Sequence, residues 1–252
     1  MIYIEIFVLD KLRVFLENFF GFCGIIDGSD YLSKTNPGTR CVVKALVKEF
    51  SFPIIWELLF ICLFILRPFK TLYLFFIYYL VLLVYFRESF SFKDYKDNFE
   101  RIKGFWLPVV ITTIAAFGAY WVKVNLIQRN FFMVDGTYNI TWENSYIGEA
   151  LYALTIMFLG PIVSELFYRK AIMRFDGPLP TAISFFAGLI LCAFGSAYLP
   201  LGLLEAVLLA LPYAVAYLCT KNVYVTITVH IIFMLYHHVP NIIYDVARIS
   251  LR

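Results

Sequence analysis

The sequence carries little charge, few histidines and no clustered cysteines. Only 15% of its 252 residues are charged, and three are histidine. Soluble domains contain about 25% charged residues, so this composition excludes an ordinary soluble globular protein. The five cysteines stand apart, at positions 23, 41, 62, 192 and 219, and form no CxxC pair or Cys/His cluster. Neither a disulfide framework nor a zinc ribbon is therefore indicated.

The net charge and the first residues argue against two further classes. A formal net charge of +3 is small and gives no reason to expect a nucleic-acid partner. The N-terminus lacks the basic start, short apolar run and small-residue cleavage site of a signal peptide. We therefore expect the chain to enter the membrane through its own helices.

The sequence is rich in long apolar stretches. Hydrophobic residues make up 62% of it, and the mean hydropathy is +0.78. A helix needs about 20 mainly apolar residues to cross a bilayer, or fewer where flanking residues reach the interface. We predict an all-α, polytopic transmembrane helix bundle with about seven spans, six and eight being the limits. The predicted spans are 52–66, 71–86, 105–122, 146–168, 181–198, 203–220 and 223–238.

The predicted spans divide the chain into three regions. Residues 2–26 are apolar but interrupted by charges, which favours an N-terminal interfacial helix over a span. We assign 1–51 to an interfacial and cytoplasmic segment, 52–104 to a short transmembrane hairpin with a cytoplasmic loop, and 105–252 to the membrane core. A cytoplasmic N-terminus places 15 of the 21 Lys and Arg residues inside, as the positive-inside rule favours. We expect a multi-pass cell-membrane protein with its C-terminus outside.

A charged pair lies within the predicted span 146–168 and just beyond its end. Glu165 and Arg169 stand four residues apart, so a helix brings them to one face. A charge near the bilayer centre costs at least about 2.5–3.5 kcal/mol, so an intramembrane ionisable residue is a functional-site hypothesis. The alternative is a clamp in which the two charges only neutralise each other. The preceding Gly160 and Pro161 interrupt the helix, which favours a polar cavity nearby.

Three short segments in or beside the later spans form a recognisable pattern. Residues 164–169 read SELFYR, 194–198 read FGSAY and 230–234 read HIIFM. They resemble the EExxxR, FxxxH and HxxxN/D motifs of the CPBP (Abi) family of CAAX-type intramembrane proteases and bacteriocin-immunity proteins. In that family each motif lies on its own transmembrane helix. The resemblance covers roughly residues 105–238.

The resemblance implies a site in which a glutamate and the histidines activate water and the last motif supports the oxyanion. Here it points to Glu165, Arg169, His230 and Tyr198 as candidate site residues. A bound metal is also implied by the family. Three motif positions differ, however, because Ser164, Tyr198 and Met234 stand where the family has glutamate, histidine and asparagine.

The substituted residues cannot do the same chemistry. Serine is no base near neutral pH, tyrosine is a poor base or metal ligand, and methionine donates no hydrogen bond. A zinc-type site needs about three N/O/S protein ligands. One carboxylate and one imidazole fall short, so the cofactor stays unknown and a divalent metal lacks a full ligand set. A lone intramembrane His230 also has the alternative reading of a hydrogen-bonded bundle residue.

Depth along the helices separates the candidates. At 1.5 Å per residue, Glu165 and His230 lie at similar depths from the inner helix ends, whereas Tyr198 lies further out.

A second HxxxN match begins at His237, but Pro240 should break its helix, so we interpret it as an interfacial helix end. The remaining carboxylates Glu57, Glu149 and Glu205 are expected at interfacial positions because each is near the start of its span.

Two functions fit these patterns. The first is a catalytically degenerate CPBP-like protein that acts as scaffold, chaperone or immunity factor for a membrane protein or peptide partner. The second is an active, atypical glutamate-dependent intramembrane endopeptidase of CAAX-processing type. In the second, Glu165 would be the base, His230 its partner and Tyr198 the oxyanion donor. A transporter is a third class, without an inverted repeat to support it.

Overall fold

The computed structural model describes residues 51–66, 71–130, 140–197 and 199–251, with side chains left out for 62–66. Within these ranges the chain forms helices and no strands, so the predicted all-α fold class is confirmed. The predicted N-terminal interfacial helix lies outside the described residues. Residues from Phe52 to Arg252 form one compact unit.

The helices follow the predicted spans closely. They are α3 (Ser51–Leu66), α4 (Thr71–Tyr85), the short turn Arg87–Ser89, α5 (Phe92–Phe99), α6 (Leu107–Val122), α7 (Tyr146–Tyr152), α8 (Gly160–Glu165), α9 (Pro178–Phe194), α10 (Pro200–Thr220) and α11 (Val223–Ser250). Short π-helical segments extend α6 to Ile102–Gln128 and join α7 and α8 into one helix, Tyr146–Ala171.

Fewer of these helices are long enough to cross a membrane than the sequence predicted. Four described helices meet the length and hydropathy needed, namely Ile102–Gln128, Tyr146–Ala171, Pro200–Thr220 and Val223–Ser250. A fifth span forms only if α4 and the segment Arg87–Phe99 count as one helix bent by 64°. The described parts of α3 and α9 are shorter apolar helices. The chain is thus a multi-pass membrane protein, and the count of about seven spans is not confirmed.

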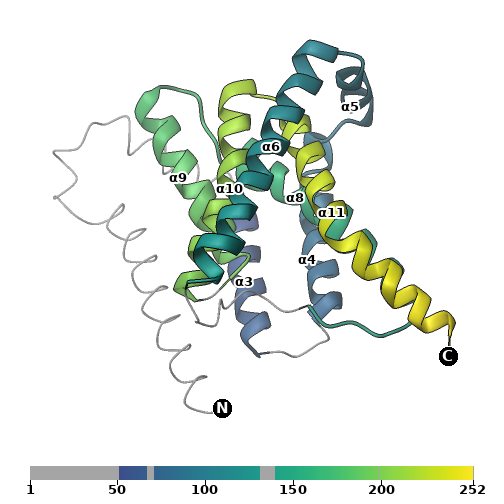
Figure 1. Ribbon diagram of the computed structural model, residues 1–252. Coiled ribbons are helices and arrows are strands. Elements are labelled where there is room, and N and C mark those ends of the chain that lie inside the picture. The colour runs from purple at the N-terminus through teal and green to yellow at the C-terminus, as the bar shows by residue number, and fades with distance from the viewer. Residues whose placement is uncertain (1–50, 67–70, 131–139, 198, 252) are drawn as a thin grey trace. The chain divides into compact units, whose positions relative to one another are not determined.

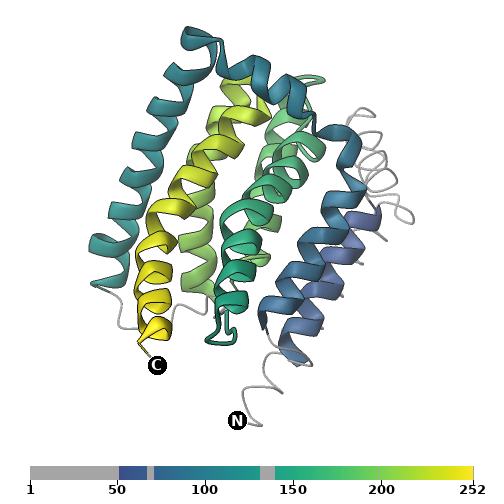
Figure 2. The same ribbon diagram turned by 90° about the vertical axis from the view of Figure 1, so that its right-hand side faces the viewer.

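The helices form a bundle in which the C-terminal half surrounds the helix Tyr146–Ala171. Figure 2 shows α6, α11, Tyr146–Ala171 and the α3–α4 pair running side by side, with α5 across one end. Helix α9 packs against α10, and α10 also packs against α6 and α11 (Figure 1). This arrangement places the central helix between the N-terminal hairpin and the last helices.

A two-residue connection fixes how α10 meets α11. Lys221 ends α10 in the left-handed conformation, with φ of 51°. Asn222 then caps α11, since its side chain accepts a hydrogen bond of 3.0 Å from the backbone N–H of Tyr224. Because the connection is this short, the two helices run antiparallel and their facing side chains meet. That geometry brings Tyr213 of α10 onto His230 of α11.

The expectation that Pro240 breaks its helix is wrong. Helix α11 continues through Pro240 to Ser250, twelve residues past the predicted end at 238. Proline removes one backbone hydrogen bond and crowds the preceding turn. Pro240 is exposed, on the outer side of α11, where a helix can bend away from its neighbours without losing packing.

Candidate functional site

The helix that carries Glu165 departs from regular α geometry on both sides of it. Residues Ala153–Leu159 and Leu166–Ala171 are π-helical, and Gly160–Glu165 between them is α-helical. Pro161 lacks the N–H that would continue a regular ladder, which accounts for a widened turn before it. π-Helical turns inside α-helices are frequent at functional sites. Gly160 and Pro161 both line a cavity beside Glu165, as the sequence led us to expect.

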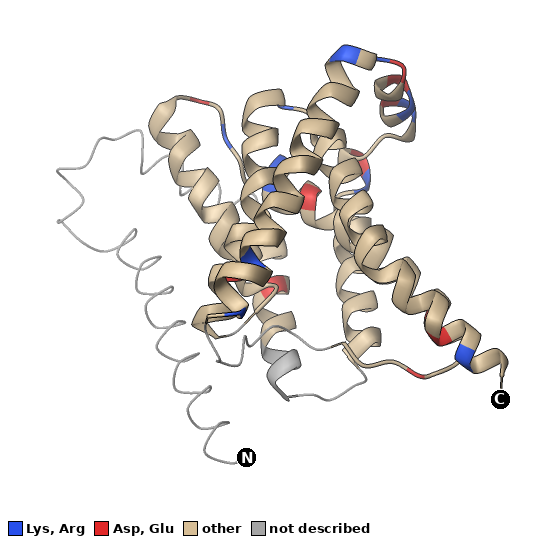
Figure 3. Ribbon diagram, in the orientation of Figure 1, with Lys and Arg blue, Asp and Glu red and all other residues tan. Residues whose placement is uncertain are grey.

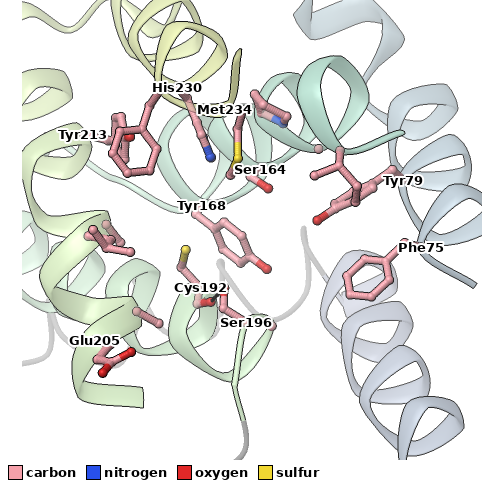
Figure 4. A pocket seen from close by; sticks show the side chains of 18 of the residues that line it. Phe75, Tyr79, Ser164, Tyr168, Cys192, Ser196, Glu205, Tyr213, His230 and Met234 are labelled. Carbon is pink, nitrogen blue, oxygen red and sulfur yellow. Dashed lines mark hydrogen bonds between the residues drawn. The ribbon is translucent and has the colours of Figure 1, made fainter. Parts of the chain in front are cut away.

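The cavity has a volume of about 290 Å³ and opens between the central helix and its neighbours. Its walls combine apolar and aromatic side chains with a few polar groups, among them Ser164, Tyr168, Arg169, Cys192, Tyr213 and His230. Figure 4 shows that five of these, together with Met234, surround one space. Small-molecule and peptide sites have this composition, with a few polar groups set in an apolar wall.

Glu165 is held between two cationic or potentially cationic side chains. Its Oε1 lies 3.0 Å from Nδ1 of His230, and its Oε2 lies 3.4 Å from Nε of Arg169. Glu165 is 1% exposed and does not line the cavity. Helix periodicity brings Arg169 to Glu165, whereas packing of α11 on the central helix brings His230 there. The structure therefore joins three of the four candidate residues.

Both partners of Glu165 are anchored from α10. Nη2 of Arg169 donates a hydrogen bond of 3.1 Å to the backbone carbonyl of Ala210. The ring of Tyr213 stacks on the ring of His230, with centroids 4.9 Å apart and planes 22° from parallel. His230 faces the cavity with its side chain 14% exposed. Helix α10 thus fixes the positions of the guanidinium and the imidazole.

Three buried polar atoms of the cavity wall have no hydrogen-bond partner among the described residues. They are Nη1 of Arg169, the hydroxyl of Tyr213 and Oε1 of Glu205. Leaving a buried donor or acceptor unpaired costs about 1–3 kcal/mol, so such groups are normally met by water or a ligand. The cavity therefore offers two donors and one acceptor to whatever occupies it.

The three carboxylates expected at interfacial positions are buried inside the protein. Glu57, Glu149 and Glu205 are 1%, 3% and 0% exposed, which shows their packing and leaves their depth in the membrane a prediction. Each one has partners within the protein that the linear sequence does not show. Glu205, for example, lies 3.1 Å from Nζ of Lys123 and accepts a hydrogen bond of 3.2 Å from Gln128. The helices Ile102–Gln128 and α10 are linked by this cluster at the cavity wall.

Glu57 is a functional candidate that sequence reasoning missed. It accepts hydrogen bonds from the hydroxyls of Tyr78 and Tyr168, the latter at 2.8 Å. Both tyrosines line the cavity. Gly195 makes room for this group, because a Cβ at that position would lie 2.5 Å from Glu57 Oε1 and 2.6 Å from the Tyr168 hydroxyl. The only sequence signal was an isolated carboxylate in an apolar helix.

Of the three motif positions that differ from the family, two line the cavity and one lies outside the described residues. Ser164 and Met234 line the cavity, so the substituted side chains face the same space as His230 (Figure 4). The Ser164 hydroxyl interacts with the Tyr79 side chain. Tyr198 lies outside the described residues.

The side chains around Glu165 do not fit a metal ion. Among the described residues, no group of three His, Cys, Asp or Glu side chains converges on one point. Glu165 and His230 already engage each other, and the second histidine motif does not join them. His238 instead meets the hydroxyl of Tyr152 through Nδ1, at 2.8 Å, and His237 packs its ring on Tyr120. The donor set is thus too small for a zinc-type centre.

Comparison with known proteins identifies the segment that carries this site. Residues 146–236 match the family described as "Rce1-like: Type II CAAX prenyl endopeptidase Rce1-like", which is part of the CPBP family. Over these residues, about a third of the chain, the sequence is similar to CPBP-family proteins. The CPBP-like segment contains Glu165, Arg169 and His230, as well as the substituted Ser164 and Met234. No curated protein and no solved structure matches the chain significantly.

The CPBP-like segment covers the helices from α7 to the first half of α11. Glu57 comes from outside this segment, and so do Lys123 and Gln128, the partners of Glu205. The cavity is therefore built from the family segment together with helices that the family match does not cover.

Proposed function

We propose that this CAAX-protease-like membrane protein binds a membrane protein or peptide partner through a degenerate protease site and does not cleave it. The observation that carries the proposal is the burial of Glu165 between His230 and Arg169, behind the cavity wall. One Glu165 oxygen faces His230 at 3.0 Å and the other faces Arg169 at 3.4 Å. A general base needs to lie within about 3 Å of the water it activates. Glu165 is buried behind the cavity wall and presents no oxygen to water in the cavity.

The substitutions at the cavity support the same proposal. The family's other carboxylate position is Ser164, and its oxyanion-supporting amide position is Met234, and both side chains line the cavity. Neither supplies the missing base or donor. The cavity itself is retained, with donors on Arg169 and Tyr213 that a bound peptide could satisfy. Because the base and the oxyanion donor are missing while the cavity remains, we favour a role as scaffold, chaperone or immunity factor.

An active, atypical endopeptidase is the second candidate. It is favoured by the Glu165–His230 contact, which resembles a base oriented by an imidazole. In that reaction Glu165 would activate water, with His230 as its partner and Tyr198 as oxyanion donor. The Arg169 guanidinium would hold the carboxylate in place.

Two assays separate the candidates. Purified protein in proteoliposomes is incubated with prenylated and unprenylated CAAX peptides, and products are identified by mass spectrometry. We expect no cleavage from wild type. Specific cleavage by wild type that disappears in both Glu165→Ala and His230→Ala would contradict the binding proposal.

The second assay is affinity purification from native membranes. Wild type and the Glu165→Ala/His230→Ala double variant should recover the same stoichiometric partner in intact form. Glu88→Gln serves as the matched control, because Glu88 is 89% exposed and away from the cavity. A substrate retained only by the double variant would indicate an enzyme.

We also propose the topology that the charge distribution favours. The N-terminus and residues 1–51 lie on the cytoplasmic side, 52–104 form a hairpin with a cytoplasmic loop, and the core 105–252 ends outside. Accessibility of single cysteines to a membrane-impermeant maleimide tests it. Labelling of a cysteine at position 250, but not at 97, in intact cells is expected.

A further inference from the structure

A second cavity lies apart from the Glu165 site, where α7 begins and α11 ends. It has a volume of about 250 Å³ and is lined by Thr141, Trp142, Asn144, Glu149, Asp245 and Arg248, together with Ile140. Helix α7 packs on α11 at this end, and the Tyr152 hydroxyl meets Nδ1 of His238 at 2.8 Å. The segment before α7, the start of α7 and the end of α11 therefore form the walls of this cavity.

The cavity contains a buried carboxylate that is only half satisfied. Oε1 of Glu149 accepts a hydrogen bond of 2.6 Å from the indole of Trp142. Oε2 is buried and has no partner among the described residues, although Glu149 is only 3% exposed and lines the cavity. Trp142 is itself held by stacking on Tyr152, with centroids 4.1 Å apart. The free oxygen is thus presented by a rigid wall and needs a hydrogen-bond donor.

The charges of the cavity leave one negative charge uncompensated. Two carboxylates, on Glu149 and Asp245, face one guanidinium, on Arg248. Arg248 already pairs with Asp245, with Nη2 and Oδ1 2.8 Å apart. A buried carboxylate without a cationic partner is costly. A ligand that brings an ammonium group to Glu149 would supply both the missing donor and the missing charge.

Arg248 makes the site suited to a zwitterion rather than to a simple cation. Its side chain is 49% exposed, so part of the guanidinium remains open to an anion. Guanidinium groups bind phosphate through two parallel hydrogen bonds. A calcium ion would need six to eight oxygen ligands and would be repelled by this guanidinium. An ammonium at Glu149 and a phosphate at Arg248 use both charges of the cavity.

The position of the cavity fits the bilayer interface. Helix α11 has 28 residues, or about 42 Å at 1.5 Å per residue, which exceeds the roughly 30 Å hydrocarbon core. Its charged residues lie only toward its C-terminal end (Figure 3). Beside the cavity, Tyr146, Ile147, Ile243 and Tyr244 are 54%, 81%, 63% and 68% exposed. Exposed aliphatic and tyrosine side chains at a helix end are typical of contact with lipid.

We propose that this cavity binds the phosphoethanolamine headgroup of a phospholipid. The primary ammonium donates to Oε2 of Glu149, the phosphate pairs with Arg248, and the acyl chains run along the exposed apolar side chains of α7 and α11. A primary ammonium fits because Glu149 needs an N–H donor, which a choline headgroup lacks. The site is independent of the function of the Glu165 cavity.

Native mass spectrometry of the full chain in detergent tests this site with three lipids that share acyl chains. They are phosphatidylethanolamine, phosphatidylcholine and phosphatidylglycerol, added over a concentration series. We expect phosphatidylethanolamine to bind at least about tenfold more tightly than the other two. Phosphatidylcholine has no N–H donor for Glu149, and phosphatidylglycerol has no cationic group for it. Soluble phosphoethanolamine should compete with the lipid.

Two variants assign the contacts. Glu149→Gln should abolish the preference for phosphatidylethanolamine over phosphatidylcholine, and Arg248→Ala should weaken all three phospholipids while leaving that preference. The exposed Glu88→Gln is the matched control and should bind like wild type. Arg248 is half exposed, so its variant folds even if Glu149→Gln does not. Equal binding of the three lipids by wild type, tightest binding of phosphatidylglycerol, or an unaffected Arg248→Ala variant would each overturn the proposal.

Discussion

The hydroxyl of Tyr168 donates a hydrogen bond of 2.8 Å to Glu57, a residue 111 positions earlier in the chain. Tyr168 belongs to the CPBP-like segment, and Glu57 belongs to α3 outside it. The hydroxyl of Tyr78 in α4 meets the same carboxylate. One buried carboxylate therefore fastens the N-terminal hairpin to the wall of the main cavity. The hairpin thus contributes to the wall of the main cavity.

Glu57→Ala should destabilise the protein because it leaves two buried hydroxyls without their acceptor. A loss of about 1–3 kcal/mol per unsatisfied group is expected. Thermal unfolding of detergent-purified protein measures it, with the exposed Glu88→Ala as control. In a double-mutant cycle, Tyr168→Phe should cost less in the Glu57→Ala background than in wild type. Additive costs would show that the two side chains are not coupled.

Gly195→Ala tests how closely the Glu57 group is packed. The added methyl would lie 2.5 Å from Glu57 Oε1 and 2.6 Å from the Tyr168 hydroxyl, so something must move. Overpacking of this kind typically costs about 1–3 kcal/mol. Gly118→Ala in α6 is the matched control, because its Cβ would meet nothing within 4 Å. It should be neutral or stabilising by up to about 1 kcal/mol, and equal effects of the two substitutions would contradict this packing.

Removing one charge of the Glu165–Arg169 pair should be worse than removing both. Glu165→Leu leaves a guanidinium that is 1% exposed without its carboxylate, for which a cost of about 3–5 kcal/mol is expected. The double variant Glu165→Leu/Arg169→Leu should recover much of that stability, since buried pairs are often replaceable by apolar residues. Unfolding midpoints of both variants and wild type provide the measurement. A double variant less stable than Glu165→Leu would count against the ion pair.

Restoring the family's residues should create activity if the site is degenerate. The triple variant Ser164→Glu, Tyr198→His, Met234→Asn replaces the three positions at which the chain departs from the family motifs. We expect it to cleave a prenylated CAAX peptide at a rate that wild type does not reach. Adding Glu165→Ala should remove this gain. Cleavage by wild type at the same rate as the triple variant would mean that the substitutions are not what sets activity.

The local features of the fold and site were predictable from the sequence. Apolar stretches located the helices, because a helix in lipid must be apolar over most of its length. The spacing of Glu165 and Arg169 predicted their contact, because residues four apart share a helical face. The interruption at Gly160 and Pro161 indicated the cavity. The prediction that Pro240 ends its helix was wrong, because an exposed proline can be accommodated within a packed helix.

The sequence alone determined that this is a helical membrane protein, that Glu165 and Arg169 form a pair, and that three positions differ from the motifs of the family it resembles. Only the tertiary structure decided which residues complete the sites. His230 reaches Glu165 across 65 positions, Glu57 reaches Tyr168 across 111, and Glu149 meets the end of α11 in a second cavity. Helical periodicity fixes neighbours within a few residues, whereas these contacts depend on which helices pack together. A lone carboxylate in an apolar helix therefore looks the same in sequence whether it lies at the interface or at the centre of a site.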